Sequence, residues 1–175
     1  MQTDSLFIEE RLSDDRHIRI VSDFDCGENK ELEDFLKSDA FAYNRDGQGN
    51  TYLIFDKRRQ NIIGYYTLRT NAIQAYNSEN DRVEVFPSIE IARFAISTDY
   101  QSQGYGKLIF FLSILPKINE VKNVIGINTI MLFSVDTEQA LSFYTKIGFK
   151  QTNEDVRQFI NEDCNKGCKL MYVNI

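Results

Sequence analysis

A polar segment with two glycines is the part of the sequence best suited to chemistry. Gln101, Gly104 and Gly106 form the spacing Gln-x-x-Gly-x-Gly, directly after the strand-like run 89–96 and before an apolar run. A turn of this kind opens a helix whose first backbone N–H groups are unpaired, and the helix dipole adds partial positive charge there. Glycine also lets a phosphate approach the backbone. The segment 101–107 therefore predicts a phosphate-binding loop.

Two common phosphate loops do not fit this segment. No Gly-Lys-Ser/Thr sequence follows it, as a Walker loop requires, and the third glycine of the dinucleotide fingerprint is missing. The spacing by itself also suits an ordinary turn. A ligand at this loop is therefore expected to be another phosphate-bearing cofactor.

A second pattern lies closer to the C-terminus, in the run Ala140-Leu-Ser-Phe-Tyr144-Thr-Lys-Ile-Gly148-Phe149. It predicts a helix that Asp136 caps at its start and that ends at a left-handed Gly148. A tyrosine on the apolar face of such a helix is usually a core residue.

The two patterns together resemble the signatures of the GNAT superfamily of acetyl-CoA-dependent N-acetyltransferases. In that family the pyrophosphate loop follows Gln/Arg-x-x-Gly-x-Gly/Ala, and a later signature follows Ala-x-x-Phe-Tyr-x-x-x-Gly-Phe. Residues 63–67 also resemble the strand that precedes the acetyl-CoA half of the fold, so the resemblance covers nearly all of residues 24–175. It implies that acetyl-CoA is the cosubstrate and that a primary amine attacks its thioester directly.

The resemblance implies a role for each matching residue. Tyr144 would protonate the departing thiolate, and Thr137 stands where many relatives carry an asparagine that hydrogen-bonds the cofactor. The strand end 94–96 would offer backbone groups to the pantetheine arm, and the amides of 101–107 would wrap the pyrophosphate. The implied cofactor-binding residues are Phe94, Ala95, Ile96, Gln101, Ser102, Gln103, Gly104, Tyr105, Gly106, Lys107 and Thr137.

Glu90 is the candidate general base, because its strand borders the cleft in the resembling fold. An alkyl amine with a pKa of about 10.4 is only ~0.04% neutral at pH 7, a penalty of roughly 4–5 kcal/mol that a base or a desolvating pocket must offset. Glu90 could act through a water molecule. The alternative is a glutamate that faces solvent or lies on a sheet edge.

A mixed α/β fold is needed to position these residues. The order strand, glycine turn, helix and strand over residues 89–135 predicts a crossover between two parallel strands. The expected fold is one GNAT-like domain, residues 1–175, with a mostly antiparallel sheet, helices on both faces and a splayed parallel strand pair. Its acceptor-side part would be about 1–75 and its acetyl-CoA-binding core about 89–150. The expected strands are 17–21, 51–55, 62–70, 89–96, 127–135, 149–152 and 168–174.

Composition excludes several other classes of function. The 175 residues carry a net charge of −6, which argues against a surface shaped throughout for nucleic acid or anionic membrane. Three cysteines and a single histidine, His17, predict free thiols and no metal site. His17 lies among charged residues in what reads as a solvated segment, so no catalytic triad is expected. The absence of a signal peptide or a long apolar run predicts a cytoplasmic protein without a membrane anchor.

The acceptor is left with three alternatives. The box Phe24-Asp25-Cys26-Gly27 resembles the opening of GNAT toxins from bacterial toxin–antitoxin pairs, which would imply charged tRNA as acceptor and an antitoxin as partner. However, residues 1–46 carry a net charge of −7, which favours cationic amines of a small molecule or protein over RNA. The third alternative is an acyl-CoA sensor without turnover. Homodimers are common in the resembling family.

Overall fold

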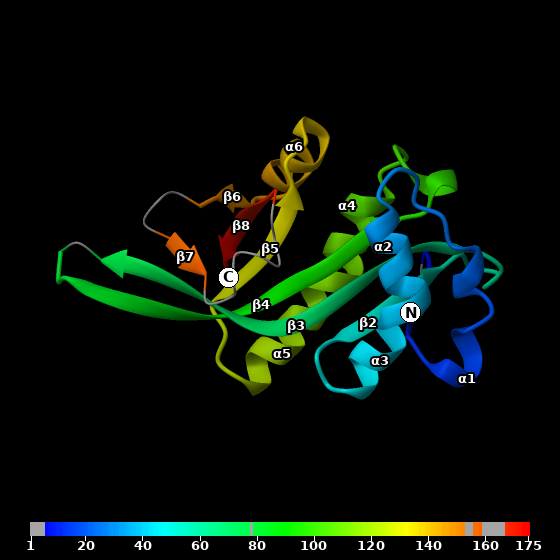
Figure 1. The fold of residues 1–175 in the computed structure, drawn as a ribbon, viewed down its shortest axis with the longest axis horizontal. Helices are drawn as coiled ribbons and strands as arrows, with labels where there is room; N and C mark the ends of the chain where they lie inside the picture. The colour runs from blue at the N-terminus through cyan, green and yellow to red at the C-terminus, as the bar shows by residue number, and fades with distance from the viewer. Residues whose placement is uncertain (1–5, 78, 153–155, 159–166) are drawn as a thin grey trace, which may run out of the picture. The chain divides into compact units, whose positions relative to one another are not determined.

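The computed structural model describes residues 6–77, 79–152, 156–158 and 167–175, and it divides the chain into two compact units (Figure 1). The first unit comprises residues 1–68 and 93–117, and the second comprises residues 69–92 and 118–175. Two long strands, β3 (Ile62–Asn77) and β4 (Arg82–Ile96), contribute residues to both units. The expectation of one domain over 1–175 stays a prediction.

The remaining elements are short, and two π-helical turns, η2 and η4, join α-helices into longer helical runs. Those that begin in the first unit are β1 (Ile8–Arg11), α1 (Asp14–His17), η1 (Val21–Asp23), α2 (Lys30–Asp34), η2 (Phe35–Asp39), α3 (Ala40–Arg45), β2 (Asn50–Phe55), η3 (Thr98–Tyr100), α4 (Tyr105–Ile109), η4 (Phe110–Ile114) and α5 (Leu115–Val124). Those of the second unit are β5 (Thr129–Val135), α6 (Glu138–Lys146), β6 (Lys150–Gln151), β7 (Val156–Gln158) and β8 (Cys168–Asn174).

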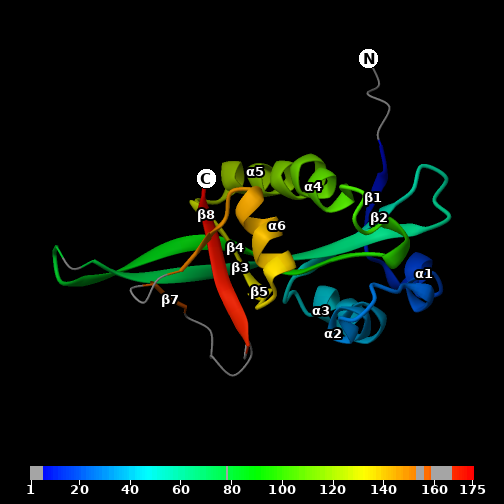
Figure 2. The same cartoon turned by 90° about the horizontal axis from the view of Figure 1, so that it is seen from above.

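In the first unit the strand order is β1-β2-β3-β4, and helices lie on both faces of this sheet. Figure 2 shows α2 and α3 on one face and α4 on the other. The strands β2 and β3 pair antiparallel with Thr51 opposite Thr67, and the hydroxyl oxygens of these two buried residues lie 2.9 Å apart. This hydrogen bond satisfies both side chains inside the sheet.

The core of the first unit lies between the α2–α3 run and the sheet. Tyr65 is its centre, because Phe24 packs edge-on against its ring at 5.5 Å and its hydroxyl donates to the carbonyl of Leu32 over 2.6 Å. The buried phenol of Tyr65 therefore has a hydrogen-bond partner inside the apolar core. The core residues are Leu12, Val21, Phe24, Cys26, Phe35, Leu36, Ala40, Leu53, Phe55, Ile62, Tyr65 and Ala95.

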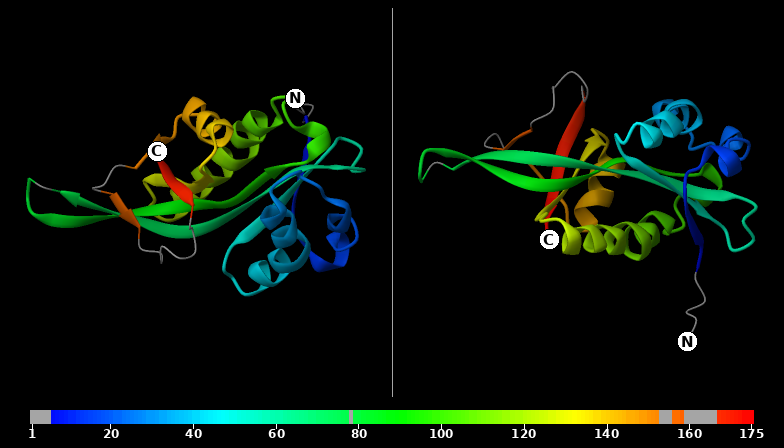
Figure 3. Two further views of the ribbon diagram at one scale, coloured as in Figure 1. Left: turned by 45° about the horizontal axis from the view of Figure 1, so that its top comes forward. Right: turned by 90° about the horizontal axis from the view of Figure 1, so that it is seen from below.

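In the second unit, β4 pairs with β5 in parallel and β5 pairs with β8 antiparallel (Figure 3). The strand β6 continues the sheet beyond β8, and β7 pairs with β3. The residues 129–132 of β5 are all buried, as is usual for a strand covered on both faces. The expected fold class is therefore confirmed: a mixed, mostly antiparallel sheet with helices and one parallel pair.

The segment 17–21 is not the strand that its alternating isoleucines suggest. It contains the end of α1 and the start of η1, and the backbone N–H of His17 donates to the carbonyl of Ser13 over 3.0 Å. Asp14 and Asp15 in the first turn favour a helix here, because their negative charges are attracted to the positive end of its dipole. The sequence also misses β1 and β7, whereas 168–174 forms β8 as expected.

Helix starts also differ from the expected caps. Asn29 caps α2, since its side chain accepts from the backbone N–H of Leu32. The spacing of Asp25 and Glu28 also suits a capping box, but the side chain of Asp25 accepts from the N–H of Gly27. The start of α6 is capped by Thr137 rather than Asp136. Gly148 has a φ of +108°, which confirms the left-handed end of that helix.

Gly64 is a position where any side chain would disturb the sheet. A Cβ at Gly64 would lie 2.5 Å from the carbonyl oxygen of Ala95, whereas a Cβ at Gly126 would meet nothing within 4 Å. We therefore expect Gly64→Ala to lower the free energy of unfolding by about 2 kcal/mol, because the backbone of β4 must shift. Gly126→Ala, the control, should change it by less than about 0.5 kcal/mol. Urea denaturation of the two variants measures this, and equal effects would contradict the close approach.

Candidate active site

The parallel pairing of β4 with β5 covers only three residue pairs, 88–90 with 129–131. The strand β4 then continues to Ile96, so residues 91–96 lie beyond the last β5 pair. Within the first unit, the end of β4 is held by β3: the N–H of Ser97 donates to the carbonyl of Ile63 over 2.8 Å. The predicted pantetheine-binding residues Phe94, Ala95 and Ile96 occupy this end of the strand.

The loop after β4 adopts the conformation that the glycine spacing predicts. Gly104 has a φ of +85° and immediately precedes α4, and Ser102 is also left-handed with a φ of +59°. From Tyr105 the helical run continues through η4 and α5 to Val124. The first helical hydrogen bond here runs from the N–H of Leu108 to the carbonyl of Gly104.

This loop fits the diphosphate of acetyl-CoA. Within the described residues, no hydrogen-bond acceptor is assigned to the backbone N–H groups of 102–107, as expected at the start of a helix. Residues 101–104 and Lys107 are exposed, and a Cβ at Gly104 would meet nothing within 4 Å, so the approach to these amides is open. Exposed, unpaired backbone amides at the start of a helix are the hydrogen-bond donors to which a phosphate group binds.

The side chain of Gln101 does not point its donors toward such a ligand. Its amide nitrogen donates to the carbonyl of Ile96 over 2.9 Å and to the carbonyl of Cys26 over 3.0 Å. The sequence pattern placed Gln101 among the cofactor-binding residues, and its backbone still begins the loop. The contact with Cys26 spans 75 positions of the chain, and no local sequence signal indicates it.

Tyr144 lies on α6 in the second unit, where aromatic rings surround it. Its ring is 5.1 Å from that of Phe143 and 5.8 Å from that of Phe149. Burial raises the pKa of the Tyr144 phenol above its ordinary value of about 10, so the group stays protonated at neutral pH. No hydrogen bond is assigned to this hydroxyl among the described residues. A protonated phenol of this kind can donate to a ligand.

Thr137 uses its side chain locally. Its hydroxyl oxygen accepts from the N–H of Ala140 over 3.3 Å and so caps α6. This contact fixes the start of the helix that carries Tyr144. The hydroxyl proton remains available as a donor, so the predicted cofactor contact of Thr137 stays a prediction.

Glu90 is buried, with 2% of its surface exposed, and it is held by two side chains of the second unit. Arg69 donates to both carboxylate oxygens, from Nε over 2.6 Å and from Nη2 over 2.9 Å, and Asn71 donates from Nδ2 over 2.6 Å. A carboxylate has about four acceptor positions, and three of them are used here. These contacts hold Glu90 as the charged partner of Arg69. Its role as general base stays a prediction.

His17 is a structural residue, which corrects the expectation of a solvated segment. It is 3% exposed, its Nδ1 accepts from the N–H of Ser13 over 3.0 Å, and its Nε2 lies 3.1 Å from Oε2 of Glu10. An acceptor at Nδ1 places the proton on Nε2, which then donates to Glu10. Burial, together with the charge of Arg16, lowers the pKa of His17.

The part of the chain that the structure describes contains neither a metal-binding cluster nor a membrane-spanning helix. Within it, no group of three or more His, Cys, Asp or Glu side chains could hold a metal ion. None of its helices is both long and apolar enough to cross a membrane. Cys26 is buried and Cys168 lies in β8, whereas Cys164 falls outside the described residues.

Solved structures of the toxin AtaT have similar folds. A mutant AtaT toxin is 21% identical, with a TM-score of 0.76 over 99% of this chain and 93% of that chain. A mutant bound to the C-terminus of the antitoxin AtaR and to acetyl-CoA is 23% identical, with a TM-score of 0.71 over 96% and 92%. AtaT complexed with acetyl-methionyl-tRNAfMet is 24% identical, with a TM-score of 0.70 over 90% and 96%.

A sequence comparison places the chain in a family. Residues 48–151, more than half of the chain, match the acetyltransferase (GNAT) domain. This range contains β4, the glycine loop, β5 and the helix of Tyr144. The shared fold and the acetyl-CoA bound in one neighbour agree with this match. The chain therefore belongs to the GNAT family of acetyltransferases, which use acetyl-CoA as acetyl donor.

Proposed function

We propose that this acetyltransferase transfers the acetyl group of acetyl-CoA to the α-amino group of an aminoacyl-tRNA. The observation that carries the proposal is the likeness to AtaT in complex with acetyl-methionyl-tRNAfMet, which covers 90% of this chain and 96% of that one. This likeness includes the N-terminal region before residue 48, where the family match begins. The acceptor-side role of residues 1–75 belongs to the same proposal.

The proposed reaction assigns a task to each part of the site. The amides of 102–107 bind the diphosphate, and residues 94–96 of β4 align the pantetheine arm by backbone hydrogen bonds. The amine nitrogen then attacks the thioester carbon, and the carbon–sulfur bond breaks as the tetrahedral intermediate collapses. Tyr144 gives its proton to the leaving sulfur and regains one from water, and the proton lost by the amine passes to water. The raised pKa of Tyr144 keeps this proton in place until the sulfur becomes charged.

The contacts of Glu90 favour an acceptor amine of low pKa. Arg69 and Asn71 already occupy three of its acceptor positions, so the carboxylate is poorly placed to take a proton from an alkylammonium ion. Deprotonating an α-amino group with a pKa of about 7.8 requires only about 1 kcal/mol at pH 7, against roughly 4–5 kcal/mol for an alkyl amine. An α-amino acceptor therefore needs little help from a base.

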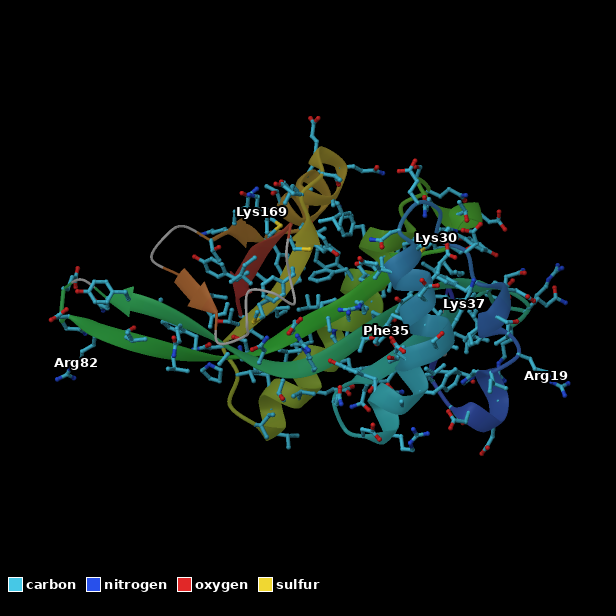
Figure 4. All side chains as sticks on the ribbon, viewed as in Figure 1. Arg19, Lys30, Phe35, Lys37, Arg82 and Lys169 are labelled. Carbon is cyan, nitrogen blue, oxygen red and sulfur yellow. The ribbon has the colours of Figure 1, made fainter. Side chains whose placement is uncertain are left out.

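The acidity of the N-terminal region is a weaker obstacle to RNA than its formal charge suggests. Glu33 is buried between Lys30 at 2.9 Å and Lys37 at 3.5 Å, and the hydrogen bond from Lys30 lowers its pKa to about 2. Lys30 and Lys37 both project from the α2–η2 run (Figure 4). Glu10 pairs with Arg59, and Glu9 pairs with Lys117 at 2.9 Å. The net charge of −7 already counts Lys30 and Lys37, whereas Arg59 and Lys117 lie outside residues 1–46 and offset two of its acids.

The proposed partners follow from this acceptor. AtaT has been solved with the C-terminus of the antitoxin AtaR, and we propose a partner of the same kind for this chain. Charged tRNA is a cytoplasmic substrate, so the chain would act in the cytoplasm. Homodimer formation stays a prediction.

The acceptor is tested by offering charged tRNA, N-terminal peptides, amino acids and polyamines to the purified protein with acetyl-CoA at pH 7. Release of free thiol should be fastest with charged tRNA and should stop after ribonuclease treatment. Faster turnover with polyamines would contradict the tRNA proposal. Tight acetyl-CoA binding without turnover of any acceptor would identify an acyl-CoA sensor. Induced expression should arrest bacterial growth.

Tyr144→Phe tests the general acid. We expect kcat to fall by about 10²- to 10⁴-fold, because the thiolate must leave without a proton, whereas the dissociation constant for acetyl-CoA should stay nearly unchanged. Because the pKa of Tyr144 is raised, the wild-type kcat should not decline up to about pH 9. Tyr76→Phe is the control, since it removes an exposed hydroxyl that donates only to Asp81. Full activity in Tyr144→Phe would refute the assignment.

Gly104→Ala tests the phosphate loop. A Cβ at Gly104 meets no atom, but alanine resists its φ of +85°, so the loop should leave its binding conformation and the affinity for acetyl-CoA should fall by roughly tenfold. Gly47→Ala is matched to it, since Gly47 has a φ of +70° and equally open surroundings outside the loop. Calorimetric titration compares the two variants. An unchanged affinity in Gly104→Ala would remove the loop from the binding site.

A further inference from the structure

Gln101 links two loops that lie far apart in the sequence. Its side-chain amide donates to the carbonyl of Ile96 at the end of β4 and to the carbonyl of Cys26 in the loop before α2. Thr98 strengthens the same link, because its N–H and its hydroxyl both donate to the carbonyl of Asp25 over 2.9 Å. The loop 25–29 and the loop 97–104 are therefore joined by three hydrogen bonds within one unit.

The loop 25–29 is itself held from its other side. The backbone N–H of Cys26 donates to Oε1 of the buried Glu33 over 3.1 Å, and the side chain of Asp25 accepts from the N–H of Gly27 over 2.8 Å. Gly27 has a φ of +89° and lies against the Thr98 methyl group, which would be 3.8 Å from a Cβ at this position. The carbonyl of Cys26 is thus a fixed acceptor, and Gln101 is anchored to the helical part of the unit.

Gln101 lies immediately before a strained part of the glycine loop. Gln101 has an extended backbone with a φ of −66°, and the next residue, Ser102, is left-handed although it is not a glycine. Such a conformation persists only where surrounding contacts impose it. The two hydrogen bonds of Gln101 supply contacts of this kind at the adjacent residue. The conformation that exposes the amides of 102–107 therefore depends on a side chain that faces away from them.

We propose that Gln101 is a positioning residue for acetyl-CoA, which holds the diphosphate-binding loop in shape through the carbonyls of Ile96 and Cys26. Position 101 then requires a side chain with at least two N–H donors, because both partners are acceptors. Glutamine and arginine, the two residues of the family pattern, meet this requirement. The inference rests on the proposed binding of acetyl-CoA by this loop and is independent of the acceptor.

Gln101→Met tests this role, because methionine has a similar length and no charge but donates no hydrogen bond. We expect the affinity for acetyl-CoA to fall by about tenfold, which corresponds to the loss of two ordinary hydrogen bonds. The KM for S-acetylpantetheine, which lacks the diphosphate, should change by less than about twofold. Hydrogen exchange should become faster in both loops, 25–29 and 97–104. Gln60→Met, which alters an exposed glutamine in the turn between β2 and β3, is the control.

Gln101→Arg should keep hydrogen exchange in both loops about as slow as in the wild type, because arginine can donate to both carbonyls. Added positive charge alone does not produce this effect. If Gln101→Met does not fold, Gln101→Asn replaces it, since its shorter amide cannot reach both carbonyls. Equal losses with acetyl-CoA and S-acetylpantetheine, or wild-type affinity for acetyl-CoA, would overturn the inference. If Gly104→Ala leaves acetyl-CoA binding unchanged, the loop proposal itself fails. The hydrogen-exchange rates of loops 25–29 and 97–104 in Gln101→Met then still test whether Gln101 holds these loops.

Discussion

The short extent of the parallel pairing between β4 and β5 is the constraint on which the rest of the structure depends. Paired strands twist relative to each other, and here the pairing stops after Glu90 and Met131. The strand β4 nevertheless keeps its extended form as far as Ile96. Its last residues are held by β3, where Gly64 permits a close backbone approach and Ile63 accepts from Ser97. β3 therefore holds the last residues of β4, which lie beyond the last β5 pair.

Charged groups inside each unit are held by matched partners. Glu90 has Arg69 and Asn71, and Glu33 has two lysines and a backbone N–H. Removing one member of a buried pair commonly destabilises a protein by about 3–5 kcal/mol, because the other charge remains in a dry environment. These pairs therefore restrict which residues can change independently.

The sequence was informative about several features that are encoded locally, although the segment 17–21 and the cap of α6 were predicted wrongly. The glycine loop, the helix of Tyr144 with its end at Gly148, and the strand 168–174 all follow from spacing within a few residues. Contacts between distant segments were not predictable in this way. The partners of Glu90 lie about 20 positions away, on another strand, and Cys26 lies 75 positions from Gln101. His17 is buried for the same reason, since its surroundings come from Glu10 and Phe55 rather than from its charged neighbours.

The paired hydroxyls of Thr51 and Thr67 have a consequence for how the chain reaches this fold. If β2 and β3 paired with a register shifted by one residue, each hydroxyl would be buried in the sheet without a partner. Each orphaned hydroxyl would then carry a desolvation penalty that no apolar contact could cancel. A mismatched hairpin would thus be short-lived, and its separation would give the chain another attempt at the correct alignment. The contact between these two hydroxyls therefore favours the observed register over one shifted by a residue.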